Sequence, residues 1–104
     1  QSRGGAEQGP GALREAGLID KLKSLDIGVV DYGDVECETI SWDEPIEGLR
    51  SPRSVGAANK KLSNGVSELL KLNQSVLTLG GDHSMAIGSI HGHAQVEPNL
   101  VVIW

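Results

Sequence analysis

An apolar stripe with helical spacing runs through the middle of this 104-residue chain. The stripe recurs every three or four residues, so its members share one face of a helix: Val55, Ala58, Leu62, Val66, Leu69 and Leu70. Ser51 and Pro52 are typical of a helix start, because serine caps the first turn and proline fits it. Lys71 and a left-handed Asn73 are typical of a helix end. The pattern therefore predicts one amphipathic helix between residues 51 and 73.

Three short apolar runs surround this helix, and each is typical of a buried strand. Residues 27–30 are largely β-branched, residues 76–79 end at a Gly-Gly pair, and residues 100–104 form the third run. A second helix is predicted over residues 85–96. Strands that alternate with helices through short connections are typical of a parallel sheet with helices packed on it. The sequence therefore predicts an α/β fold.

The remaining segments are predicted to be short helices and loops. Residues 3–11 carry four glycines and one proline, which favours a loop. Two groups of apolar residues then follow on either side of Gly17, and they predict two short helices or one kinked helix. Residues 33–50 are acidic and show no periodicity, so we expect a surface loop with few contacts.

Charge and hydrophobicity exclude several classes of partner. The formal net charge is -5 and no cluster of Lys and Arg is present, whereas binding a phosphate backbone requires one. The longest wholly apolar run, residues 100–104, is too short to cross a bilayer. Cys37 is the single cysteine, so no disulfide can form within the chain. We therefore expect a soluble protein that binds neither nucleic acid nor a membrane.

Asp82 and His83 are the residues best placed for chemistry. They follow run 76–79, and ligands of open α/β sheets bind at the carboxyl ends of the strands. Gly80 and Gly81 allow the sharp turn that can direct both side chains into a crevice. A structural interpretation is also open, in which Asp82 caps the next helix and His83 packs as a neutral, hydrogen-bonded side chain.

Other candidate groups fit a catalytic or binding role less well. His91 and His93 are two residues apart on a predicted helix, so they cannot chelate one ion together, and each is interpreted as a surface or supporting residue. The glycine-rich opening lacks the Lys and Ser/Thr of a P-loop. The carboxylates of loop 33–50 are interpreted as solvated charge. These patterns identify no catalytic residue and no substrate-binding residue.

Four segments of the chain resemble the arginases of the ureohydrolase family. They are Arg-Gly-Gly-Ala-Glu-Gln-Gly-Pro at 3–10, Asp-Tyr-Gly-Asp at 31–34, Pro-Arg-Ser-Val-Gly at 52–56, and Leu-Gly-Gly-Asp-His-Ser-Met-Ala-Ile-Gly-Ser at 79–89, which continues to Gly-His-Ala at 92–94. The resemblance implies a three-layer αβα fold with a mostly parallel sheet. Residues 1–104 would be a partial catalytic domain that lacks the first strand and everything after the fourth strand of the family.

The same resemblance implies an enzyme that hydrolyses L-arginine to L-ornithine and urea at a site of two manganese ions. His83 would be one metal ligand, and the other ligands would be mainly carboxylates further along the chain. Arg3 would lie near the mouth of the active site. The family is typically homotrimeric, and we expect a cytoplasmic location, with mitochondrial as the alternative.

Both ends of the sequence are abrupt, since Gln1 is not an initiator Met and run 100–104 resembles a strand cut off along its length. We therefore expect a fragment that is inactive alone and that cannot form a continuous sheet, because neighbouring strands of the family are missing. Three alternatives remain open: an agmatinase-like ureohydrolase, a catalytically silent arginase-like subunit, or a binding module that uses the same sheet.

Overall fold

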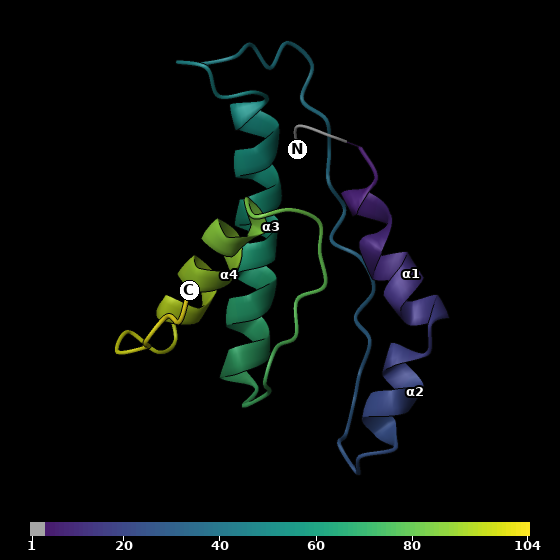
Figure 1. Cartoon of the computed structure of the whole chain (residues 1–104). Helices are drawn as coiled ribbons and strands as arrows, with labels where there is room; N and C mark the ends of the chain where they lie inside the picture. Colours follow the sequence, from purple (N-terminus) through teal and green to yellow (C-terminus); the bar gives the residue numbers. More distant parts are fainter. Residues whose placement is uncertain (1–3) are drawn as a thin grey trace. The chain divides into compact units, whose positions relative to one another are not determined.

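The computed structural model describes residues 4–104 (Figure 1). In chain order the elements are a 3₁₀ helix η1 (Ala6–Gln8) and the α-helices α1 (Gly9–Glu15), α2 (Leu18–Lys23), α3 (Pro52–Lys71) and α4 (Met85–Ala94). The chain divides into two compact units. The first unit extends to Asp34 and also contains Leu79–Asp82, and the second comprises Val35–Thr78 and His83–Trp104.

The helices of the first unit are separated by a glycine. Gly17 adopts a left-handed backbone with φ of 85°, which an L side chain rarely tolerates, and it stands between α1 and α2. Pro10 lies in the first turn of α1, where its missing N–H leaves no helical hydrogen bond unmade. The predicted interruption at Gly17 is confirmed, and it produces two short helices.

Helix α3 confirms the long helix that the apolar stripe predicted. Asn73 takes the left-handed conformation with φ of 60°, as expected for the end of this helix. Its N–H donates to the carbonyl of Leu70 at 2.9 Å, and the N–H of Gln74 donates to the carbonyl of Leu69 at 3.2 Å. These two bonds form the Schellman motif, which satisfies carbonyls that the helix itself leaves unpaired.

The start of α3 differs from the prediction, because the side chain of Ser51 does not cap it. The carboxylate of Asp43 takes this role: its Oδ1 accepts from the N–H of Arg53 at 2.9 Å and its Oδ2 from the N–H of Ser54 at 2.7 Å. Desolvation raises the pKa of Asp43, but the hydrogen bonds from Ser54 and Arg53 outweigh it and leave that pKa lowered. Asp43 is therefore a helix cap and not a freely solvated charge.

Loop 33–50 lies at the surface as expected, but it makes more contacts with α3 than the sequence suggested. Lys61 donates to Oε1 of Glu38 at 2.8 Å and to the carbonyl of Glu36 at 3.1 Å. The N–H of Ile40 donates to Oγ of Ser54 at 3.1 Å. These hydrogen bonds therefore hold the loop against the first half of α3.

Helices α3 and α4 pack against each other (Figure 1). Their contact is made mainly by small residues. The buried positions of the pair are Asn59, Ser63, Val66 and Ser67 on α3, with Gly88 and Gly92 on α4. A Cβ at Gly92 would lie against the carbonyl oxygen of Ser63 and 2.9 Å from its Cα, so only glycine fits there. The α4 backbone thus rests directly on α3. Val66 is the one buried hydrophobic residue within the described part of the chain.

The three apolar runs do not pair as strands among residues 4–104, where the only bridge joins Ile46 and Leu49. The predicted parallel sheet is therefore wrong for these residues taken alone. The physical reason is that a strand becomes stable only when neighbouring strands satisfy its backbone N–H and C=O groups. The result agrees with the expectation that these segments cannot form a continuous sheet by themselves.

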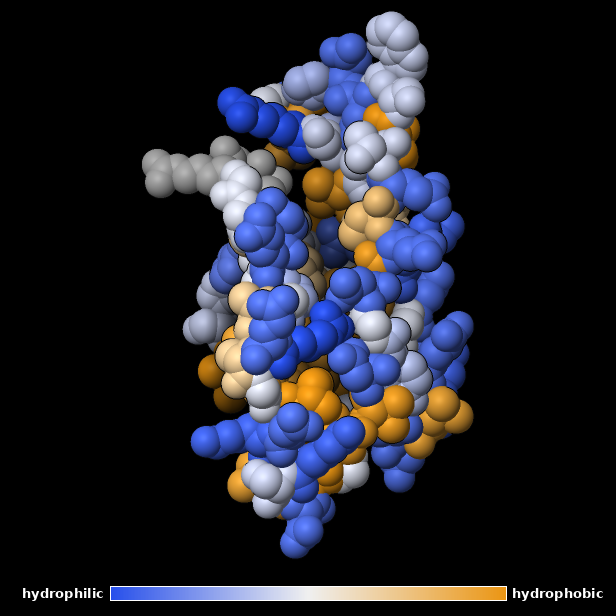
Figure 2. Space-filling view, turned by 90° about the vertical axis from the view of Figure 1, so that its right-hand side faces the viewer, coloured by the Kyte–Doolittle hydropathy of each residue, from blue (hydrophilic) through white to orange (hydrophobic). Residues whose placement is uncertain are grey.

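Apolar side chains of these runs are consequently exposed, and Figure 2 shows hydrophobic residues at the surface. The exposed set includes Ile27, Val30, Leu77, Val101 and Ile103. Ile103 is 96% exposed, which is far from the burial expected for a strand of a covered sheet. None of the helices within residues 4–104 combines the length and the hydrophobicity that a membrane span requires.

Gly92→Ala should destabilise the intact protein, because the new methyl group would press on the backbone of Ser63. We expect a loss of about 1 to 3 kcal/mol in the free energy of unfolding, measured by urea denaturation. Gly65→Ala on α3 is the matched control, since a Cβ there meets nothing within 4 Å. The control should be neutral or stabilise by up to about 1 kcal/mol. Equal effects of the two variants would contradict the close helix contact.

Candidate functional site

His83 lies in the turn directly before α4, where the sequence predicted it. Gly81, with φ of 76°, supplies the left-handed residue of this turn. The carbonyl of His83 accepts from the N–H of Ala86 at 3.2 Å, so the backbone of His83 joins the first turn of α4. Its side chain is exposed, and its ring meets that of Trp104 edge to face, with 4.5 Å between centroids and 73° between planes.

The chemistry of the available donors decides how His83 could take part in a metal site. An imidazole nitrogen is a suitable ligand for a divalent transition metal in a site otherwise built of oxygens. Within residues 4–104, however, no three His, Cys, Asp or Glu side chains converge closely enough to hold an ion. A metal site that included His83 would therefore need further donors besides these side chains. Ser84 occupies the cap position of α4, which the structural interpretation had given to Asp82.

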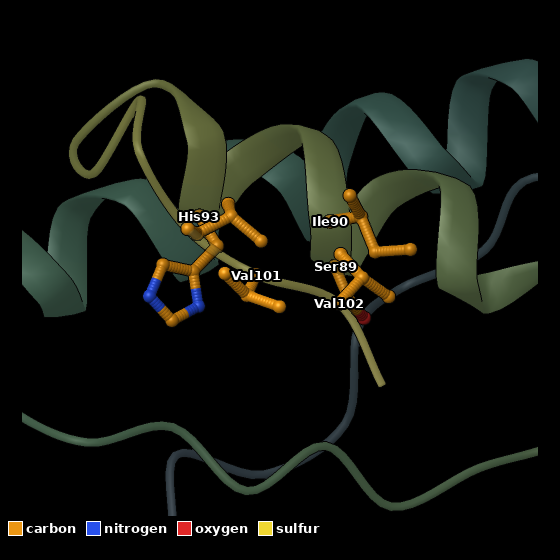
Figure 3. Close-up of a pocket in the computed structure, with 6 residues that line it drawn as sticks. Ser89, Ile90, His93, Val101 and Val102 are labelled. Carbon is orange, nitrogen blue, oxygen red and sulfur yellow. The ribbon is translucent and has the colours of Figure 1, made fainter. Parts of the chain in front are cut away.

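His91 and His93 have different neighbours, as their spacing predicted. Nδ1 of His91 lies 2.8 Å from Oγ of Ser63, so this ring links α4 to α3. His93 instead lines a shallow pocket of about 450 Å³ between α4 and residues 100–102 (Figure 3). The rest of the lining is mostly apolar: Ser89, Ile90, Leu100, Val101 and Val102. Neither histidine joins His83 in a donor cluster.

The glycine-rich opening packs against the Gly-Gly pair that precedes Asp82. A Cβ at Gly9 would lie 2.9 Å from the carbonyl oxygen of Gly80, and the N–H of Gly81 donates to the carbonyl of Ala6 at 3.4 Å. The opening glycines therefore allow two backbones to approach, which is a packing role and not a phosphate cradle. Arg3, expected near the mouth of the active site, lies outside the described residues.

Segment 31–34 is held by an ion-pair cluster with α1. Nε of Arg14 donates to Oδ2 of Asp31 at 2.7 Å, and Nη1 donates to Oδ1 of Asp34 at 2.7 Å. The N–H of Gly33 also donates to Asp31 at 2.9 Å. The hydrogen bond from Arg14 is the main reason that the pKa of Asp31 is lowered, and the bond from Gly33 adds to it. Sequence reasoning did not find this contact.

Comparison with known proteins gives a match to the model of the arginase family over residues 1–104. The chain belongs to the arginase family. It is 54% identical to Arginase-1 of Sus scrofa, 52% identical to Arginase-1 of Homo sapiens and 50% identical to hepatic arginase of Aquarana catesbeiana. Each alignment covers 100% of this chain and 32% of the relative, so the chain spans about a third of the length of these proteins.

The family match confirms the resemblance carried by the four segments of the sequence. In this arginase-family chain, the described part of the first segment packs against Gly80 and Gly81, and the other three segments also have a visible structural role. Segment 31–34 binds Arg14, segment 52–56 begins α3, and segment 79–89 forms the His83 turn and the start of α4. The role of His83 as a metal ligand stays a prediction.

Asp31→Asn should lower thermal stability near neutral pH and have little effect in acid. Because the folded-state pKa of Asp31 is lowered, its stabilisation is complete above the ordinary aspartate pKa of about 4 and is lost as the pH falls below it. The difference in Tm between the variant and the parent should therefore shrink between pH 6 and pH 3. Asp20→Asn on α2 is the control. A difference that stays constant with pH would contradict the ion pair.

Proposed function

We propose that the intact protein containing this chain is an arginase, which hydrolyses L-arginine to L-ornithine and urea. The match of the arginase family model to residues 1–104 carries the proposal. The three arginases named above are 50% to 54% identical over the same residues. Because the chain covers 32% of each relative, the activity is proposed for the intact protein, in which residues 1–104 form part of the catalytic domain.

His83 is proposed as one ligand of a pair of manganese ions. Its exposed imidazole in the turn before α4 supports this role, as does the suitability of imidazole in an oxygen-rich manganese site. The remaining ligands are proposed to be carboxylates from other parts of the protein. Such ions, when bound, would lower the pKa of water and so supply hydroxide at neutral pH.

The contribution of this chain is to position the imidazole. Gly81 makes the turn that brings His83 to the first turn of α4, and Trp104 packs against the ring. A ligand whose side chain is already restricted loses less conformational freedom when it binds an ion, which favours affinity. Strong activation of water is needed here because a guanidinium carbon is a poor electrophile. A homotrimeric assembly and a cytoplasmic location, with mitochondrial as the alternative, stay predictions from the family.

The intact protein should release urea from L-arginine and not from agmatine. Equal or greater release from agmatine would favour an agmatinase-like enzyme, and no release from either would favour a catalytically silent subunit. A colorimetric urea assay with manganese present measures both rates. The substrate that is hydrolysed distinguishes an arginase from an agmatinase-like enzyme. This test does not depend on whether His83 binds manganese.

His83→Ala should lower manganese affinity by more than about tenfold. Substitution of a residue that only hydrogen-bonds to a metal ligand already lowers metal affinity by about tenfold or more. The affinity can be measured by calorimetric titration of the metal-free protein, and urea release should fall with it. His93→Ala is the matched control, because that imidazole lines a separate pocket on α4. Unchanged manganese binding by the His83 variant would contradict the assignment.

A further inference from the structure

The side chain of Asn59 connects α3 to the first turns of α4. Its Oδ1 accepts from the N–H of Gly88 at 2.7 Å, and its Nδ2 donates to the carbonyl of Val55 at 3.0 Å. Asn59 is 8% exposed, so solvent does not compete strongly for these bonds. Because both ends of the amide are engaged, the side chain is held in a single orientation.

The hydrogen bond to Gly88 replaces one that a regular helix would make within itself. An α-helical N–H at this position ordinarily donates to the carbonyl four residues earlier, which belongs to Ser84. In α4 the carbonyl of Ser84 accepts from the N–H of Ile87 at 3.3 Å. The N–H of Gly88 donates instead to Oδ1 of Asn59. A polar side chain of α3 therefore satisfies a buried donor near the start of α4.

The same point is a close backbone contact between the helices. A Cβ at Gly88 would lie 2.7 Å from the carbonyl oxygen of Asn59 and 2.8 Å from its Oδ1. The α4 backbone is thus fixed both by packing and by a hydrogen bond at Gly88, which is separated from His83 by little more than one helical turn of sequence. The second polar link, between Ser63 and His91, lies further along α4 and away from the His83 turn.

We propose that Asn59 is a positioning residue for His83. By holding the N–H of Gly88, it fixes the first turns of α4 and with them the turn that presents the imidazole to a metal ion. This inference rests on the proposed function, because it takes His83 as a manganese ligand. It assigns to a polar residue in the middle of α3 a role in metal affinity that the apolar pattern of that helix does not indicate.

Asn59→Leu in the intact protein keeps the number and branching of the side-chain heavy atoms and removes both hydrogen bonds. We expect manganese affinity, measured by calorimetric titration of the metal-free protein, to fall by about tenfold or more. Hydrogen exchange at the Gly88 amide should become faster before any metal is added. Asn59→Asp retains an acceptor for the Gly88 N–H and should retain most of the affinity. Asn59→Ala, which has no side-chain acceptor for the Gly88 N–H, replaces the Leu variant if that variant does not fold.

Ser63→Ala is the matched control, because it removes the second link between the same two helices. It should reduce thermal stability but leave manganese affinity unchanged. Equal losses of affinity in the Asn59→Leu and Ser63→Ala variants would mean that Asn59 acts only through helix stability, and this would overturn the inference.

His83→Ala separates failure of the inference from failure of the proposed function. If the His83 variant loses affinity and Asn59→Leu does not, the inference fails and the metal assignment stands. If the His83 variant binds manganese normally, the proposed role of His83 fails and the inference with it.

Discussion

The packing of the second unit depends on the direct contact between the backbones of α3 and α4. Gly88 and Gly92 stand four residues apart on α4, and neither has room for a side chain. Their absence of side chains brings the N–H of Gly88 within reach of Asn59 and the ring of His91 within reach of Ser63. Residues 4–104 contain no large apolar core. The helix pair therefore depends on these hydrogen bonds and on close backbone packing.

The apolar residues that could have formed such a core lie mainly in the unpaired runs. Leu77 is 64% exposed and Val101 is 86% exposed, although both belong to segments rich in strand-forming residues. A sheet needs several strands at once, since each backbone group requires a partner on the next strand. Helices need only their own residues for these bonds, which explains why the helices form here and the strands do not.

Features that depend on nearby residues could be predicted from the sequence. The stripe through α3, its left-handed end at Asn73 and the break at Gly17 follow from periodicity and from the backbone preferences of single residues. The position of His83 in a turn before a helix follows in the same way. The family resemblance required only short segments of characteristic sequence, and the family match confirmed it.

Contacts between distant residues could not be predicted from these patterns. Asp43 caps α3 from the acidic loop, Arg14 pairs with Asp31, and Asn59 reaches Gly88 across 29 positions of sequence. In the sequence, Asn59 cannot be distinguished from a solvated polar side chain beside an apolar stripe. Only the approach of α4 reveals that it is buried and bonded.

The proposal that His83 is a metal ligand can be tested most directly by locating manganese in a crystal of the intact protein through its anomalous X-ray scattering. The predicted result is an anomalous peak within bonding distance of an imidazole nitrogen of His83, with Asn59 still bonded to the N–H of Gly88. Manganese bound elsewhere, with the His83 ring free of any metal, would contradict the proposal.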